Sequence, residues 1–104
     1  MEDVNFSDIT QDKTALVLHA EDNVGVALSD LKAGDSVLVA QDEGKKYEFQ
    51  VTEDVMFGHK FALSALSADA PVYKYGEEIG KMKAPVAAGG WIHIHNLYCD
   101  RGMK

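Results

Sequence analysis

Three short strings in the second half of the chain hold the residues best suited to chemistry. They are Gly58-His59-Lys60, Lys74-Tyr75-Gly76, and Trp91-Ile92-His93-Ile94-His95-Asn96. Each places an imidazole, an ammonium or a phenol beside a glycine or within an alternating run. Such groups are costly to bury and are not needed for folding, so their concentration indicates a binding or catalytic site.

The run from Trp91 to His95 alternates strictly between two kinds of side chain. A strand here would place the two isoleucines on one face and His93 and His95 on the other. Two imidazoles on one strand face could share a metal, an anion or a proton relay. The same pattern is also typical of the solvated face of a half-buried sheet, and the motif alone leaves both interpretations open.

The composition is typical of one small globular domain. The 104 residues allow one modest core, and 46% of them are hydrophobic. No apolar run reaches the roughly 18 residues that a transmembrane helix needs, so no membrane contact is expected. The N-terminus is acidic and lacks a hydrophobic signal core, and Cys99 is the only cysteine, so no intrachain disulfide can form. Both features favour a cytoplasmic protein.

The charge distribution also narrows the choice of partners. The net charge is −7, which argues against nucleic-acid binding because that function requires a basic surface. The acidic residues cluster early in the chain, whereas most of the histidines and several lysines lie later. An anionic ligand would therefore be attracted to the second half.

Short β-favouring runs predict an all-β fold. The expected strands cover residues 15–19, 24–28, 36–40, 47–52, 60–63, 72–75 and 90–97. Turn sequences rich in Gly, Asp and Asn separate them. The best helix candidate is a single turn near Ser29–Lys32, with a matching turn near Ser64–Ser67. Many short strands with close turns favour a compact, irregular barrel or clip of strands.

An internal repeat supports this architecture. The segment Ala27–Val37 recurs as Ala62–Val72, and its closing part recurs at Val86–Ile92. Asp69 stands where the first copy has Gly34. Because Asp adopts the left-handed backbone region more readily than most residues, we expect a left-handed turn at Asp69 and pseudo-symmetry in the fold.

Beyond these patterns, the chain resembles a known family. The residues that carry the resemblance are, in order, His19-x-x-Asp22-Asn23-Val24-x-Val26-Ala27-Leu28, Leu31-x-Ala33-Gly34, Gly58-His59-Lys60-x-Ala62-Leu63, Val72-x-Lys74-Tyr75-Gly76-x-x-Ile79-Gly80 and Gly90-Trp91-Ile92-His93-Ile94-His95-Asn96. Together they are similar to the SAF domain of altronate/galactarate dehydratases. The resemblance implies a β-clip fold.

The resemblance also divides the chain into an acidic leader (1–12), the SAF domain (13–98) and a short tail (99–104). In fused dehydratases a large catalytic domain follows the SAF domain. The tail here is too short to be such a domain, so we expect a separately encoded small subunit, with an excised domain as the alternative.

The resemblance implies a lyase that eliminates water from a sugar acid. Such an elimination needs a base, a Lewis acid and an acid that protonates the leaving oxygen. The chain has no compact Asp/Glu/His cluster, so we expect it to be inactive alone and to need a large dehydratase-like subunit that holds a divalent metal, iron or manganese. Two alternatives stay open: the small subunit of a sulfolactate sulfo-lyase, or a non-catalytic module that binds a sugar acid or a partner protein. Self-association is also left open.

The candidate site residues come from the same motifs. The expected catalytic residues are His59, His93 and His95, and the expected substrate-binding residues are Lys60, Lys74, Tyr75 and Asn96. Metal ligands within this chain are left unknown. We expect the histidines and Lys60 to lie together, Trp91 to belong to the core, and an exposed apolar patch to receive a partner.

Overall fold

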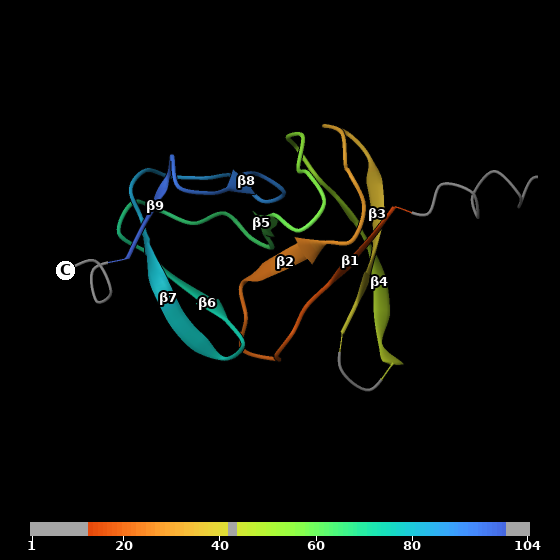
Figure 1. The fold of residues 1–104 in the computed structure, drawn as a ribbon, viewed down its shortest axis with the longest axis horizontal. Coiled ribbons are helices and arrows are strands. Elements are labelled where there is room, and N and C mark those ends of the chain that lie inside the picture. Colours follow the sequence, from red (N-terminus) through yellow and green to blue (C-terminus); the bar gives the residue numbers. More distant parts are fainter. Residues whose placement is uncertain (1–12, 42–43, 100–104) are drawn as a thin grey trace, which may run out of the picture.

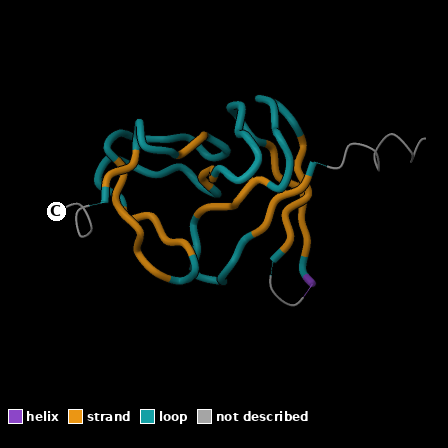
Figure 2. Tube along the Cα trace, viewed as in Figure 1, coloured by secondary structure: helices purple, strands orange, loops and turns teal. Residues whose placement is uncertain are grey.

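The computed structural model describes residues 13–41 and 44–99. These residues form nine short strands and no α-helix, which confirms the predicted all-β fold (Figures 1 and 2). The strands are β1 (Thr14–Leu16), β2 (Val24–Ala27), β3 (Ser36–Ala40), β4 (Lys46–Gln50), β5 (Lys60–Ala62), β6 (Pro71–Lys74), β7 (Glu77–Met82), β8 (Trp91–Ile92) and β9 (Leu97–Tyr98). Among the described residues, no helix is long and apolar enough to cross a lipid bilayer.

The strands make two sheets. The larger sheet has the order β4-β3-β1-β2-β5-β8, and the smaller one has the order β6-β7-β9. The pair β1 and β3 is parallel, and the other strand pairs are antiparallel. The smaller sheet lies at the end of the molecule opposite β3 and β4 (Figure 1).

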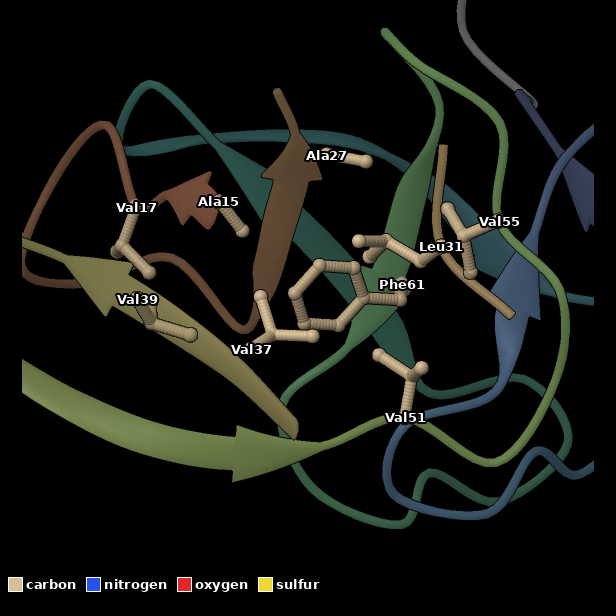
Figure 3. Close-up of a cluster of buried hydrophobic side chains, with 9 residues drawn as sticks. All are labelled: Ala15, Val17, Ala27, Leu31, Val37, Val39, Val51, Val55 and Phe61. Carbon is tan, nitrogen blue, oxygen red and sulfur yellow. The ribbon is translucent and has the colours of Figure 1, made fainter. Parts of the chain in front are cut away.

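Two hydrophobic clusters fill the interior. The larger cluster surrounds Phe61 and contains Ala15, Val17, Ala27, Leu31, Val37, Val39, Val51, Val55 and Phe61 (Figure 3). The smaller cluster contains Val24, Ala62, Val72, Met82 and Ile92. Trp91 packs against the larger cluster, whereas its neighbour Ile92 belongs to the smaller one. Because successive strand residues point to opposite sides, β8 is held between the two clusters, and this fixes the residues that follow it.

The predicted repeat is confirmed, and the structure shows a fourth copy that the sequence analysis missed. Two isolated bridges join Leu31 to Val55 and Leu66 to Val86. Each bridging residue is followed three positions later by a residue with positive φ, namely Gly34 (93°), Gly58 (85°), Asp69 (69°) and Gly89 (83°). The expected left-handed turn at Asp69 is therefore present. The missed copy, around Val55, shares little with the others beyond an apolar residue and a glycine.

The two predicted helical turns are wrong. Residues 29–32 and 64–67 bend around the bridging residues instead of coiling. The backbone N–H of Leu31 donates to Val55 O at 2.7 Å, and that of Leu66 donates to Val86 O at 2.9 Å. Because these N–H groups pair across the fold, they are not available for bonds within a helical turn.

The strand β7 was not predicted, because Glu77, Glu78 and Gly80 are poor strand formers. Its position follows from the two-residue turn at Tyr75 and Gly76, whose φ values of 61° and 77° suit a tight antiparallel hairpin. Gly80 is required by the packing, since a Cβ there would collide with the backbone carbonyl of Tyr98 in β9. Tyr75, which we had placed in a strand, lies in this turn.

The predicted leader and most of the predicted tail lie outside the described residues. The division into leader, SAF domain and tail therefore stays a prediction. Cys99, the first residue of the expected tail, is described and partly exposed.

Candidate functional site

The histidine string folds as a turn rather than as one strand. Strand β8 ends at Ile92, and His93 O accepts hydrogen bonds from Asn96 N at 3.0 Å and Leu97 N at 2.9 Å. The expectation of a continuous strand over residues 90–97 is therefore wrong. The cause is the Asn96 side chain, whose Oδ1 accepts from His93 N and whose Nδ2 donates to Trp91 O, each at 2.9 Å. These bonds replace the ladder that a strand would have needed.

The three candidate histidines nevertheless come together, around Trp91. The ring centroids of His59 and His93 are 4.4 Å apart, and those of Trp91 and His95 are 4.5 Å apart. Trp91 also lies 5.5 Å from His93 and 5.9 Å from His59. We call these four residues the aromatic stack. It forms because Lys60 pairs with Ile92 across β5 and β8, which brings the preceding and following residues, His59 and His93, side by side.

Trp91 has a role that the sequence analysis missed. It packs against the core, as expected, but its indole Nε1 also donates to His59 Nδ1 at 3.1 Å. This bond needs an unprotonated Nδ1, so the neutral His59 ring carries its proton on Nε2. The sequence could have indicated this contact, because Trp91 lies two residues before His93 and would share its side of a strand.

The surroundings of Lys60 and His93 are electrically positive. Burial, and then the nearby Lys74 ammonium, lower the pKa of Lys60. Partial burial, followed by the positive charges of His59, Lys60 and His95, lowers the pKa of His93. No hydrogen bond or ion pair from another described residue reaches the Lys60 ammonium. The predicted proximity of Lys60 to the histidines is confirmed.

Two hollows flank the aromatic stack. The acidic groove has a volume of about 790 Å³, and its lining includes Asp30, Glu53, Asp54, Met56, Trp91 and His95. The basic pocket has a volume of about 410 Å³ and is lined by Lys60, Lys83, His93, Ile94, Leu97, Tyr98 and Cys99. Trp91 and His95 thus face the groove, whereas His93 faces the pocket.

Of the remaining candidates, Lys74 lies near enough to Lys60 to lower its pKa, and Tyr75 and Asn96 have structural contacts. Tyr75 is 66% exposed at the β6–β7 turn, and this turn lies away from β8 in Figure 1. Lys74 Nζ lies 5.5 Å from the Tyr75 ring centroid, a cation–π contact. Asn96 holds the histidine turn, as described above. Substrate binding by these three residues stays a prediction.

The motif Asp22-Asn23 explains how the Tyr75 turn is held. The buried Asp22 carboxylate accepts hydrogen bonds from Tyr75 N at 3.0 Å and Gly76 N at 2.7 Å. Asn23 Oδ1 accepts from Tyr73 N at 2.8 Å. Two residues that looked like part of a chemical motif therefore anchor the β6–β7 hairpin.

The residues of the stack do not fit a metal site by themselves. Among the described residues, no group of three or more His, Cys, Asp or Glu side chains is placed to hold a metal ion. The rings of His59 and His93 are nearly parallel, with an interplanar angle of 11°. Since the nitrogen lone pairs lie in the ring planes, stacked rings do not direct them at one point.

A comparison with known protein families assigns the fold. Residues 13–100 match the model of the altronate/galactarate dehydratase SAF domain. The chain belongs to this family. The fold is therefore the β-clip that the resemblance implied, and the aromatic stack is a feature of an SAF domain.

Individual relatives show two contexts for this domain. The chain is 44% identical over 79 residues to altronate dehydratase of Escherichia coli, and 31% identical over 84 residues to that of Bacillus subtilis. These matches cover 76% and 81% of the chain but only 15% and 16% of the two enzymes. The chain is also 31% identical over 88 residues to the (2R)-sulfolactate sulfo-lyase subunit alpha of Chromohalobacter salexigens, covering 82% of the chain and 94% of that subunit.

Proposed function

We propose that this SAF domain is the small subunit of an altronate/galactarate dehydratase-like lyase, and that it helps to eliminate water from a sugar acid together with a large catalytic chain. The observation that carries this proposal is the cluster of His59, His93 and Lys60, which joins two imidazoles to an ammonium that no described residue neutralises. The identity to altronate dehydratases supports the choice of reaction.

The cluster offers the groups that an elimination needs. Lys60 can pair with a substrate carboxylate as a point charge. His93 has a lowered pKa, so it stays neutral near pH 7 and can accept the proton next to that carboxylate. The Nε2–H of the neutral His59 ring can donate a hydrogen bond to the leaving oxygen, and the proton that His93 accepts balances the hydroxyl that leaves as water. The iron or manganese that such dehydratases employ would belong to the large chain and supply the Lewis acid.

Two features support the need for a large partner. The altronate dehydratases that the chain matches are several times longer than this domain. Beside the acidic groove, Met56 and Phe57 are 60% and 65% exposed, and apolar side chains exposed to this degree suit a surface that a partner covers. The carboxylates of the groove favour a partner surface with basic residues.

A second candidate reaction is the release of sulfite from (2R)-sulfolactate. The observation that favours it is the extent of the match, because the matched segments cover 94% of the alpha subunits of two sulfo-lyases. The one from Paracoccus pantotrophus is 40% identical over 63 residues. Loss of sulfite β to a carboxylate follows the same acid–base logic as loss of water.

The test combines this chain with a large dehydratase-like chain encoded in the same genome. The two are co-purified, supplied with iron or manganese, and assayed with altronate, galactarate and (2R)-sulfolactate. We expect a stable complex that turns over at least one substrate, while neither chain alone does so. Full activity of the large chain alone would overturn the proposed role. A complex that binds a sugar acid without turnover would instead identify a non-catalytic binding module.

The matched control is a double variant, His59→Ala with His93→Ala, purified with the same partner. It should keep the complex intact and lose turnover. Retained turnover in this variant would show that the aromatic stack is only a surface feature.

A further inference from the structure

The basic pocket has a composition that contrasts with the rest of the chain. The protein carries 17 acidic and 10 basic residues, yet Lys60, Lys83 and His93 line this pocket, and none of the described Asp or Glu residues does. Two ammonium groups and an imidazole therefore face one small volume. Like charges gathered in this way repel one another unless an anion lies between them.

The two lysines keep their charge available. Lys60 has no hydrogen bond or ion pair with a described residue. Lys83 Nζ donates to Ile94 O at 3.1 Å, and a neutral carbonyl does not cancel its charge. The neighbouring Lys81 differs, because its Nζ lies 2.8 Å from Glu78 Oε2. One lysine of this region is therefore neutralised, whereas the two that line the pocket have no counter-ion among the described residues.

The apolar residues that line the pocket strengthen the attraction between its charged groups and an anion. The half-buried Leu97 and Tyr98, together with the exposed Ile94, supply the apolar part of the lining. Apolar walls exclude water and lower the local dielectric constant, so an ammonium attracts an anion more strongly there than at an open surface. A volume of about 410 Å³ suits a small organic acid.

We propose that the basic pocket binds a small organic dianion, with one acid group on Lys60 and the other on Lys83, and thereby selects acids with two negative groups over acids with one. Assigning this dianion as a lyase substrate rests on the proposed function; the binding itself does not. The chemistry is shared by a dicarboxylate such as galactarate and a carboxylate–sulfonate such as sulfolactate. Altronate, with one carboxylate, is the natural monoanion for comparison.

The experiment measures binding to the full chain without a partner. Galactarate, (2R)-sulfolactate and altronate are titrated separately, and each dissociation constant is obtained by calorimetry or from amide chemical shifts. We expect at least one dianion to bind at least about tenfold more tightly than altronate. Whichever of galactarate and (2R)-sulfolactate binds with the lower dissociation constant is the dianion that the pocket prefers.

Two variants locate the effect. Lys83→Gln should remove most of the preference for the dianion while changing altronate affinity by less than about threefold. Lys46→Gln is the matched control, since it removes the same charge from exposed β4 and should leave the preference intact. Circular dichroism should show that both variants keep the all-β fold.

Several outcomes would overturn the proposal. They are equal affinity for dianions and altronate, no dianion binding at all, or equal effects of Lys83→Gln and Lys46→Gln. Failure of the proposed function would look different, because the chain would bind a dianion normally while its complex with a large chain turned over none of the three acids. Turnover of altronate together with no dianion preference would keep the function and reject this inference.

Discussion

The acidic groove and the basic pocket are lined by different residues of the aromatic stack, and they differ in how their charges are used. In the groove, Asp30 Oδ1 accepts from Phe57 N at 2.8 Å and Asp54 Oδ1 accepts from Ala33 N at 2.8 Å. Glu53 Oε1 accepts from Trp91 N at 2.7 Å. All three carboxylates therefore hold backbone segments in place. The two lysines of the pocket form no ion pair with the part of the chain that the structure describes, which leaves their charges for a ligand.

This contrast distinguishes charged side chains that hold the fold together from charged side chains that are left to bind a ligand. Asp30 and Asp54 link the turns around the bridging pair Leu31 and Val55, so folding accounts for them. Folding does not account for Lys60 and Lys83, which line the same pocket, and burial and the nearby Lys74 ammonium already lower the pKa of Lys60. In this protein, a charged side chain that has no ion-pair partner among the described residues is better evidence of function than the sign of its charge.

The largest expected effect is a loss of stability from substitutions next to the aromatic stack. The stack residues His59 and Trp91 follow the turns at Gly58 and Gly89. A Cβ at Gly89 would lie 2.7 Å from Gln50 O and 2.8 Å from Thr52 N, whereas a Cβ at Gly58 would meet nothing within 4 Å. Both glycines have positive φ, so Gly58→Ala should lower the free energy of unfolding by about 1 kcal/mol through backbone strain alone, and Gly89→Ala by more than about 3 kcal/mol.

Urea unfolding of the two glycine variants, followed by circular dichroism, measures this difference. Equal losses of stability would show that the close packing at Gly89 relaxes at little cost.

A second comparison uses the two histidines that face different hollows. His93→Ala should lower kcat/KM of the assembled lyase by at least about tenfold, which corresponds to about 1.4 kcal/mol of transition-state stabilisation. His95→Ala should lower it by less than about threefold, because His95 faces the acidic groove. Sequence alone gave the two histidines the same role. A larger loss for His95 than for His93 would place the chemistry in the groove.

The smallest expected effect concerns pH and stability. The pKa of His93 is lowered in the folded protein by partial burial and by nearby positive charge. Between that lowered value and the ordinary pKa of about 6.5, the unfolded chain binds more protons than the folded one. Stability should therefore rise with pH through this window and level off above it.

The measurement is the free energy of unfolding from about pH 5 to pH 7.5, for the unchanged protein and for His93→Gln. The substitution should flatten the rise, because glutamine does not titrate. An unchanged slope would assign the pH dependence to other groups.

Local patterns predicted much of the fold. Strand β3 was expected with the bounds that it has, because Ser36–Ala40 is a short β-favouring run. The left-handed turn at Asp69 was read from its alignment with Gly34. Strand β7 was missed because its residues have poor strand propensity, and its pairing with β6 and β9 overrides that propensity.

For the site, the sequence pointed to histidines that do lie together, but it predicted the wrong backbone geometry for them. Alternation over Trp91–His95 predicted a strand, but the Asn96 side chain closes a turn by bonding to His93 N and Trp91 O. A side-chain amide that competes with backbone pairing has no periodic signal. Tyr75 was expected in a strand, but the Asp22 carboxylate holds it in a turn by bonding to its backbone N–H.

The sequence by itself determined the fold class, the family and the identity of the residues that gather around Trp91, because turn chemistry and strand propensity act over a few residues at a time. Only the tertiary structure decided which of them touch. The pairing of Lys60 with Ile92 stacks His59 on His93. The return of the chain through β9 brings Lys83 to the same pocket as Lys60. Such contacts depend on strand register between distant segments, and register is set by the packing of the whole core.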